Sequence, residues 1–233
     1  MNTNELVLVQ GMAATKETLA EWNRAPWATL RLWLGLSLIT ALGLLLAVHV
    51  VATESQPDLT RLTIPGVHYP VEFADVLRVL LRNSLVLALH GMACVAGFLA
   101  GSAVPQQAKL KTGVSKWVHE KAGPLAIAFV VGATTFSLAT QAYVLGNATS
   151  TVAHTLELSP AKLLLALSIH AIPELTALFL PLAAWVVASR RGDWHQLLAA
   201  TVVTVGIAIP VLVASCLVEV YVTPRVIVAL MGG

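Results

Sequence analysis

The sequence predicts an all-helical, polytopic membrane protein, and three observations support this fold class. Of the 233 residues, 57% are hydrophobic and only 11% are charged, and the mean hydropathy is +0.80. Soluble domains usually carry about 25% charged residues, so a soluble chain of this composition would expose too much apolar surface. Several long runs lack Asp, Glu, Lys and Arg almost entirely, and a spanning helix needs about 20 apolar residues. We therefore expect one bundle of five transmembrane helices.

The charge-free runs place the five helices along the chain. Residues 1–27 are expected to form a cytoplasmic or interfacial N-terminal segment, and residues 28–233 the five-span transmembrane domain. The first apolar run follows acidic residues and is too long for a signal peptide, so we expect it to stay attached as a span. Within 4–25, a loose amphipathic pattern fits an interfacial helix or a solvated lead-in. The spans are expected at about 28–52, 76–103, 122–146, 161–189 and 195–228.

The positive charges predict the orientation of these spans. Lysines and arginines gather in the N-terminal segment, in the connection 104–121 and at Arg190 and Arg191. The connection 53–75 carries more acidic than basic residues. It also contains prolines and a glycine, which predict irregular backbone there. Because cytoplasmic connections are enriched in Lys and Arg, we expect the N-terminus in the cytoplasm and the C-terminus outside. An odd number of spans agrees with this orientation.

Two ionisable side chains inside the fourth span give the first candidate for a functional site. His170 and Glu174 lie four residues apart, on one face of a helix. Glu174 is the only Asp, Glu, Lys or Arg between residues 163 and 189. A charged side chain at the centre of a bilayer costs at least about 2.5–3.5 kcal/mol on insertion scales. The pair must therefore face protein, water or an ion, either as a functional site or as a structural hydrogen-bonded pair.

Polar residues on two further spans are expected at similar depth in the outer half of the bilayer. Asn83 and His90 are seven residues apart on the second span, so they project from nearly the same face. Glu219 lies near the outer end of the fifth span. The predicted functional polar cluster therefore consists of Asn83, His90, His170, Glu174 and Glu219.

Other residues inside the spans are predicted to serve packing. Gly97 and Gly101 form a Gly-x-x-x-Gly motif, which lets helix backbones approach closely, either within the bundle or between protomers. Cys94 and Cys216 are interpreted as small apolar packing residues. A row of hydrogen-bonding side chains on the third span is expected to join the polar core: Thr134, Ser137 and Gln141.

The order of these motifs resembles the stage II sporulation protein M family over roughly residues 76–230. The resemblance rests on Asn83 before a Gly-rich second span, on His170-Ala-Ile-Pro-Glu174, and on Glu219-Val-Tyr-Val-Thr223-Pro224. This chain has Ala171 where the family usually has glycine. The resemblance implies an integral protein of the bacterial cytoplasmic (inner) membrane that works in multiprotein assemblies. Relatives act as scaffolds for envelope remodelling, or occur beside transport ATPases and in clusters that mature and export circular bacteriocins.

Three functions remain open on the sequence. The first is a non-enzymatic membrane subunit or scaffold for assembly, peptide maturation or export. Its expected partners are lipids, other membrane or envelope proteins, a separate transport ATPase and further copies of the chain, but no nucleic acid. No cofactor is firmly predicted. The second function is an intramembrane metal-dependent hydrolase or peptidase with zinc, and the third is a proton- or ion-coupled transporter. The candidate metal ligands are His90, His170, Glu174 and Glu219, with His170 and Glu174 also the catalytic candidates.

Overall fold

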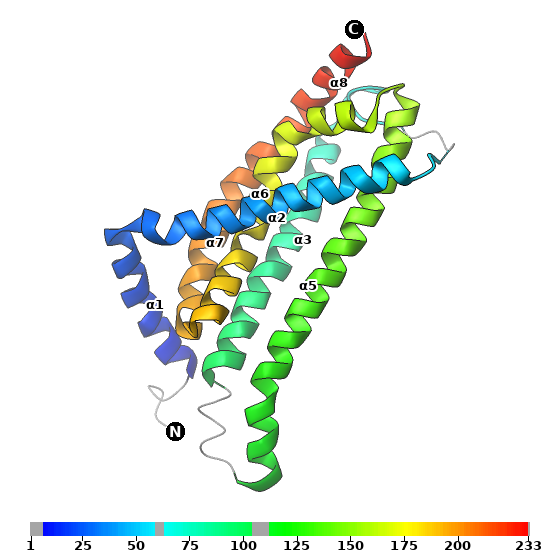
Figure 1. Cartoon of the computed structure of the whole chain (residues 1–233). Helices are drawn as coiled ribbons and strands as arrows, with labels where there is room; N and C mark the ends of the chain where they lie inside the picture. The colour runs from blue at the N-terminus through cyan, green and yellow to red at the C-terminus, as the bar shows by residue number, and fades with distance from the viewer. Residues whose placement is uncertain (1–6, 59–62, 104–111, 233) are drawn as a thin grey trace. The chain divides into compact units, whose positions relative to one another are not determined.

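The computed structural model describes residues 7–58, 63–103 and 112–232, and every named element in these ranges is a helix. Figure 1 shows these helices along the chain. The prediction of an all-helical chain is confirmed, and so is the number of helices long and apolar enough to cross a membrane. These five segments are Pro26–Glu54, Phe73–Gly101, Ile127–Thr155, Pro160–Arg191 and Trp194–Met231.

The long helices contribute to two compact units. The first unit contains residues 1–37, 87–134 and 179–207, and the second unit contains residues 38–86, 135–178 and 208–233. Each unit therefore draws its core from stretches that are far apart in the sequence.

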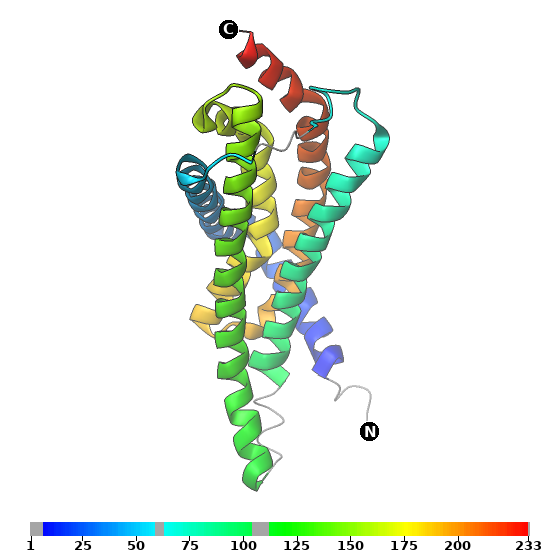
Figure 2. The ribbon, with the colours of Figure 1, turned by 90° about the vertical axis from the view of Figure 1, so that its right-hand side faces the viewer.

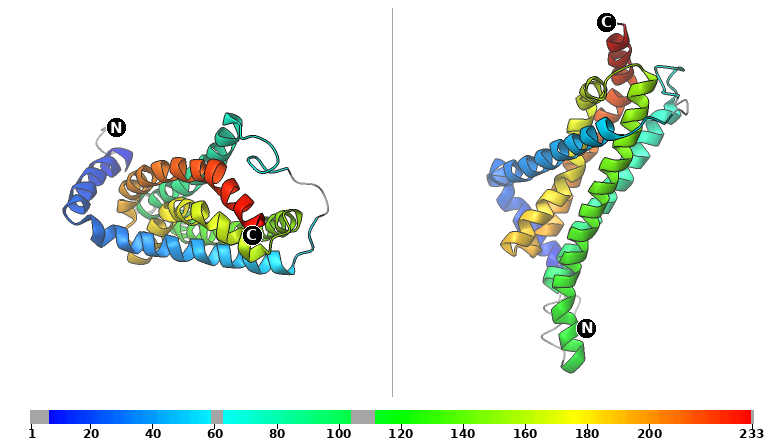
Figure 3. Two further views of the ribbon diagram at one scale, coloured as in Figure 1. Left: turned by 90° about the horizontal axis from the view of Figure 1, so that it is seen from above. Right: turned by 45° about the vertical axis from the view of Figure 1, so that its right-hand side comes forward.

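In the first unit, helix α1 (Val7–Arg24) ends just before helix α2 (Pro26–Glu54) begins. Proline is well suited to the first position of a helix, because its missing N–H would have no partner there. The indole rings of Trp22 and Trp33 meet edge to face across this corner, with centroids 5.1 Å apart. Figure 3 shows α1 turning away from α2 at this point. A helix is thus present within 4–25, and its position at a membrane interface stays a prediction.

The core of the first unit contains the Gly-x-x-x-Gly motif. Helix α3 (Phe73–Phe98) carries Gly97, and the π-helix η2 (Leu99–Ala103) that follows carries Gly101. A Cβ atom on Gly97 would lie 2.5 Å from Nε1 of Trp185, and one on Gly101 would overlap the ring of Trp194. The two glycines therefore make room for indole rings of the same chain.

Helix α5 (Gly113–Thr155), whose residues from 135 onward belong to the second unit, runs nine residues beyond the end expected at 146. Figure 2 shows this helix as one unbroken rod. It ends where Glu157 adopts a left-handed backbone (φ 55°) and the N–H of Leu158 bonds to the carbonyl of Ala153, a Schellman cap. The span was expected to end at about residue 146, and the helix itself continues to Thr155.

Helix α6 (Pro160–Arg191) has well-defined signals at both ends. The hydroxyl of Ser159 accepts a hydrogen bond from the N–H of Lys162, so Ser159 caps the first turn. At the other end Gly192 is left-handed (φ 75°), and the N–H of Asp193 bonds to the carbonyl of Ala188. These caps place His170 and Glu174 well inside the helix.

The fifth long segment is not one regular helix. After the 3₁₀ turn η3 (Trp194–Gln196) it consists of α7 (Leu197–Leu217), the π-helix η4 (Val218–Val222) and α8 (Thr223–Met231). Pro224 has no N–H to donate, and its ring would crowd the carbonyl of Val220. The chain widens by one residue just before it, so that the N–H of Thr223 bonds to the carbonyl of Val218. This wide turn carries Glu219.

Candidate functional site

The site is built around two side chains of α6 in the second unit. His170 and Glu174 lie one turn apart, and each is only 7% exposed. Nδ1 of His170 lies 2.9 Å from Oγ1 of Thr223, a buried hydrogen bond between α6 and the start of α8. Thr223 is itself 2% exposed. The imidazole is therefore held by a hydroxyl group, and not by the carboxyl group one turn away.

Glu174 is buried without full hydrogen bonding. Its Oε2 atom has no partner among the residues that the structure describes. The amide of Asn83, on α3, is close enough to interact with the Glu174 carboxyl group. Nδ2 of Asn83 nevertheless makes no well-aligned hydrogen bond with the described residues, although Asn83 is only 3% exposed. A donor and an acceptor thus lie near each other with neither one satisfied, and such buried groups are rare in folded proteins.

Glu219 brings a second carboxyl group to the same place. Its charge acts on Glu174, and so does the charge of Arg82. Oε1 of Glu219 lies 3.8 Å from Nη2 of Arg82, a loose ion pair in which Arg82 is 64% exposed and Glu219 is 26% exposed. Oε2 of Glu219 is buried and has no hydrogen-bond partner in the described ranges. The site therefore holds two carboxyl groups and one guanidinium group.

The structure brings most of the predicted cluster together. Asn83, His170, Glu174 and Glu219 all belong to the second unit, and α3, α6 and η4 supply them. His90 belongs to the first unit, where its ring lies 5.8 Å from that of Phe179. The predicted grouping of His90 with the other four residues is therefore not seen within either unit.

The hydrogen-bonding residues of the third predicted span are not part of this site. Nε2 of Gln141 donates to Oγ of Ser137, 3.1 Å away on the same helix. Ser137 is exposed and Gln141 is half-buried. Thr134 lies in the first unit and is also half-buried.

The side chains present do not favour a metal site. Among the described residues, no group of three or more His, Cys, Asp and Glu is arranged to hold a metal ion. Cys94 and Cys216 are buried free thiols. Their sulfur atoms lie 3.0 Å from the carbonyl oxygen of Pro181 and 3.3 Å from that of Val76, respectively. Both thiols thus act as small packing residues that also donate weak hydrogen bonds.

Sequence reasoning did not include Arg82 or the role of Thr223. Arg82 immediately precedes Asn83, at the edge of the charge-free run. A long basic side chain at this position can reach an acidic residue on a neighbouring helix, here Glu219. Thr223 was noted only as part of a motif. A signal for its role existed, since a hydroxyl beside Pro224 lies at a helix start, where polar side chains are common.

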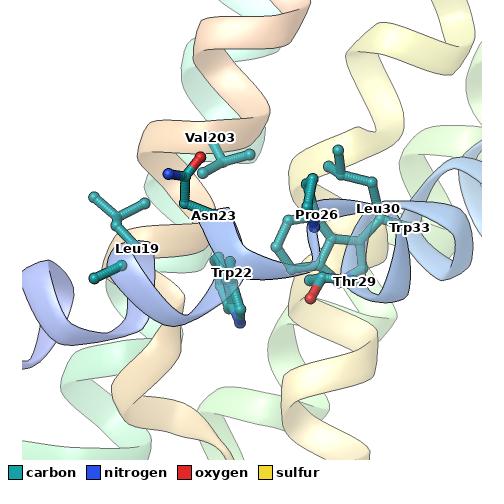
Figure 4. Close-up of a pocket in the computed structure, with 9 residues that line it drawn as sticks. Leu19, Trp22, Asn23, Pro26, Thr29, Leu30, Trp33 and Val203 are labelled. Atoms are coloured by element: carbon teal, nitrogen blue, oxygen red, sulfur yellow. The ribbon is translucent and has the colours of Figure 1, made fainter.

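A separate pocket of about 490 Å³ opens at the corner between α1 and α2 in the first unit. Figure 4 shows Trp22, Leu30 and Trp33 around it, with Asn23 and Thr29 as its polar members. Its lining is mainly apolar and includes none of the predicted site residues. This pocket was not among the features predicted from the sequence.

Comparison of the chain with protein-family models, with curated proteins and with solved structures finds no match. The five helices that are long and apolar enough to cross a membrane are those expected of a multi-pass membrane protein.

Proposed function

We propose that the chain is a non-enzymatic subunit of a membrane assembly, and that α5 is the helix through which a partner binds. The observation that carries this proposal is the exposure of α5. Only 6% of the most apolar window in Ile127–Thr155 is buried, compared with 44% of the window in Pro160–Arg191. A helix that its own chain covers so little is available to lipid or to another protein.

The side chains of α5 favour a protein partner over lipid alone. Phe136 is 74% exposed, as expected for a lipid-facing or interface residue. The next residue, Ser137, is also exposed, and its hydroxyl accepts a hydrogen bond from Nε2 of Gln141, so this part of α5 carries polar atoms. Hydrocarbon offers such groups no partners, whereas a neighbouring transmembrane helix does, and small and hydroxyl residues let helices approach closely. Gly132, which has no other atom within 4 Å of its Cβ position, adds room for close approach.

The C-terminal part of α5 is attached firmly to its own chain. A Cβ atom on Gly146 would lie 2.5 Å from Cβ of Val51, so α5 and α2 are in close backbone contact there. Oγ of Ser150 donates to the carbonyl of Ser55, and the N–H of Asp58 donates to Oγ1 of Thr151. These contacts hold the C-terminal end of α5 in place. The turns of α5 before Gly146 are therefore positioned for contact with a partner.

The setting of this subunit follows from the charge distribution and the resemblance described above. We place it in the bacterial cytoplasmic membrane with the N-terminus inside and the C-terminus outside. Its role is assembly, peptide maturation or export beside other envelope proteins, including a separate transport ATPase. Hydrolysis by the chain itself is not part of the proposal, and turnover of a peptide by the purified protein alone would contradict it.

Photo-crosslinking in native membranes tests the partner helix. A photoreactive amino acid at Phe136 is compared with the same probe at Leu46 on α2, which is similarly exposed at 65%. We expect a discrete protein adduct from position 136 only, reduced by Gln141→Leu because that change removes the polar contact. Lipid adducts alone at both positions would contradict the proposal. An adduct of twice the chain mass would identify a second copy and contradict a heteromeric partner.

A further inference from the structure

We propose that Asn83, Glu174 and Glu219 form a site that binds and releases one proton, together with a bound water molecule. This property is independent of the partner helix proposed above. It rests on the atoms that the folded chain leaves unsatisfied and on the balance of charge around them.

The unsatisfied atoms match the bonding capacity of one water molecule. Among the residues that the structure describes, Nδ2 of Asn83 is a donor without a well-aligned acceptor, while Oε2 of Glu174 and Oε2 of Glu219 are acceptors without a donor. A water molecule donates two hydrogen bonds and accepts up to two, so one water can accept from Nδ2 and donate to both carboxylate oxygens. Buried waters typically make about three such bonds to groups of this kind. The three side chains come from α3, α6 and η4, so the water joins three helices.

The charges at the site leave one negative charge in excess. Glu174 and Glu219 supply two carboxylates, and Arg82 supplies one positive charge 3.8 Å from Glu219. His170 also faces the site, but its Nδ1 is taken up by Thr223. The thiol of Cys216 lies near both carboxyl groups and is neutral as a packing residue. One proton shared between the carboxyl groups removes the excess charge, which a membrane interior would otherwise penalise.

A proton fits this site better than a metal ion. A divalent cation would require further ligands, and the described chain holds no third His, Cys, Asp or Glu in a suitable arrangement. It would also be repelled by Arg82, whereas a single proton brings the net charge of the two acids and the arginine to zero. Two neighbouring carboxyl groups that share one proton are a well-known arrangement.

The helices at the site contain features that allow a proton to enter and leave. Glu219 lies on the π-helix η4, and such wide turns are frequent at functional sites. On α6, Pro173 lies between His170 and Glu174 and leaves the carbonyl of Ile169 without its helical donor. Free backbone carbonyls of this kind attract water into a helix and permit bending.

Labelling with dicyclohexylcarbodiimide tests the proposal on the full chain in lipid vesicles. This reagent adds to a protonated carboxyl group and leaves a stable adduct that peptide mass spectrometry locates. Asp75 is the internal control, because it is equally buried (6%) but both of its oxygens are bonded, to Arg78 and to the N–H of Glu72. We therefore expect at least about tenfold more adduct on Glu174 and Glu219 together than on Asp75.

Variants of the charged residues separate proton binding from accessibility. In Glu174→Gln the remaining acid is balanced by Arg82, so the adduct on Glu219 is expected to fall by about tenfold or more. In Arg82→Gln both acids lack a positive neighbour, so the total adduct is expected to rise toward two per chain. A merely structural arginine would instead leave labelling unchanged or lower it as the fold loosens.

Three results would overturn the proton site. The first is labelling of Asp75 at the same level as the cluster. The second is unchanged labelling of Glu219 in Glu174→Gln. The third is protection of the site by sodium chloride but not by choline chloride, which would identify an alkali cation as the ligand. Circular dichroism of each variant in the same vesicles verifies that its helices are intact.

Discussion

Nδ1 of His170 lies 2.9 Å from Oγ1 of Thr223, and this buried contact joins two residues separated by 53 positions in the sequence. It connects the middle of α6 with the first residue of α8, immediately after the π-helix that carries Glu219. Because both partners are buried, the contact fixes the position of the wide turn relative to α6 and so determines where the second carboxyl group lies.

Removing the hydroxyl of Thr223 is expected to destabilise the second unit. Thr223→Val keeps the shape of the side chain but leaves a nitrogen of His170 buried without a partner. Hydrogen bonds between membrane helices contribute on average about 0.6 kcal/mol and at most about 1.7 kcal/mol. A double-mutant cycle with His170→Ala, measured by SDS-induced unfolding in mixed micelles, should give a coupling energy in this range.

Thr176 provides the matched control for this cycle. Its hydroxyl bonds to the carbonyl of Ile172 on its own helix, so Thr176→Val should show no coupling to His170→Ala. Thr223→Ser retains the hydroxyl and should restore most of the stability. Zero coupling between positions 170 and 223 would mean that the hydrogen bond does not form in the membrane.

The two glycines of the Gly-x-x-x-Gly motif are expected to tolerate no larger residue. Gly97→Ala would place a methyl group 2.5 Å from Nε1 of Trp185, and Gly101→Ala would press against the ring of Trp194. Overpacking of this kind costs typically about 1–3 kcal/mol. We expect both variants to lower the thermal unfolding temperature in detergent, without a change in oligomeric state on size-exclusion chromatography.

Gly91 on the same helix is the control for these substitutions. Its Cβ position lies 3.6 Å from Cγ2 of Val205, an ordinary van der Waals distance, and alanine is a better helix former than glycine. Gly91→Ala should therefore be neutral or stabilising. If all three alanine variants had the same effect, the close packing of indole rings on α3 would be refuted.

The sequence was sufficient to predict the long helices and the central pair of the site. Composition and charge-free runs locate helices well, and a spacing of four residues places His170 and Glu174 on one face by helix geometry alone. The side chain that approaches them from another helix could not be predicted in the same way. Whether Asn83 or His90 approaches the pair depends on the rotation of α3 about its axis and on its register along α6. Neither can be read from the sequence of an apolar helix.

Arg82 and the end of α5 show two further limits of sequence reasoning. Arg82 lies at the edge of a charge-free run, where long basic side chains commonly extend toward water, and nothing in the local pattern indicates pairing with Glu219. The third span was expected to end at about residue 146. The helix continues because Gly146 packs directly against Val51, a tertiary contact that outweighs the helix-weakening effect of glycine.

Gly66 is expected to be more sensitive to substitution than another left-handed glycine. Gly66 (φ 77°) and Gly192 (φ 75°) have similar backbones, but a Cβ atom on Gly66 would lie 2.8 Å from Cβ of Pro224, whereas Gly192 has nothing within 4 Å. Both alanine variants should lose about 1 kcal/mol to backbone strain. Gly66→Ala should lose about 1–3 kcal/mol more from overpacking.

Thermal unfolding in detergent checks this difference between the two glycines. The shift for Gly192→Ala measures the strain alone, and the additional shift for Gly66→Ala measures the contact with Pro224 at the start of α8. Equal shifts in the two variants would show that the connection before α3 does not pack on α8 in the folded protein.

Glu157 is the position where a substitution is expected to stabilise the protein. This residue holds a left-handed backbone (φ 55°) in the cap of α5, a conformation that glycine adopts without a steric penalty. Glu157→Gly should raise the unfolding free energy by roughly 0.5–1 kcal/mol, the relief of strain less the greater chain entropy of glycine. Glu157→Ala removes the charge but keeps the Cβ atom, so it should give no such gain. Unfolding measured by SDS titration compares the two variants directly. A gain in both would attribute the effect to the carboxylate, and a loss in Glu157→Gly would mean that α5 does not end in this cap.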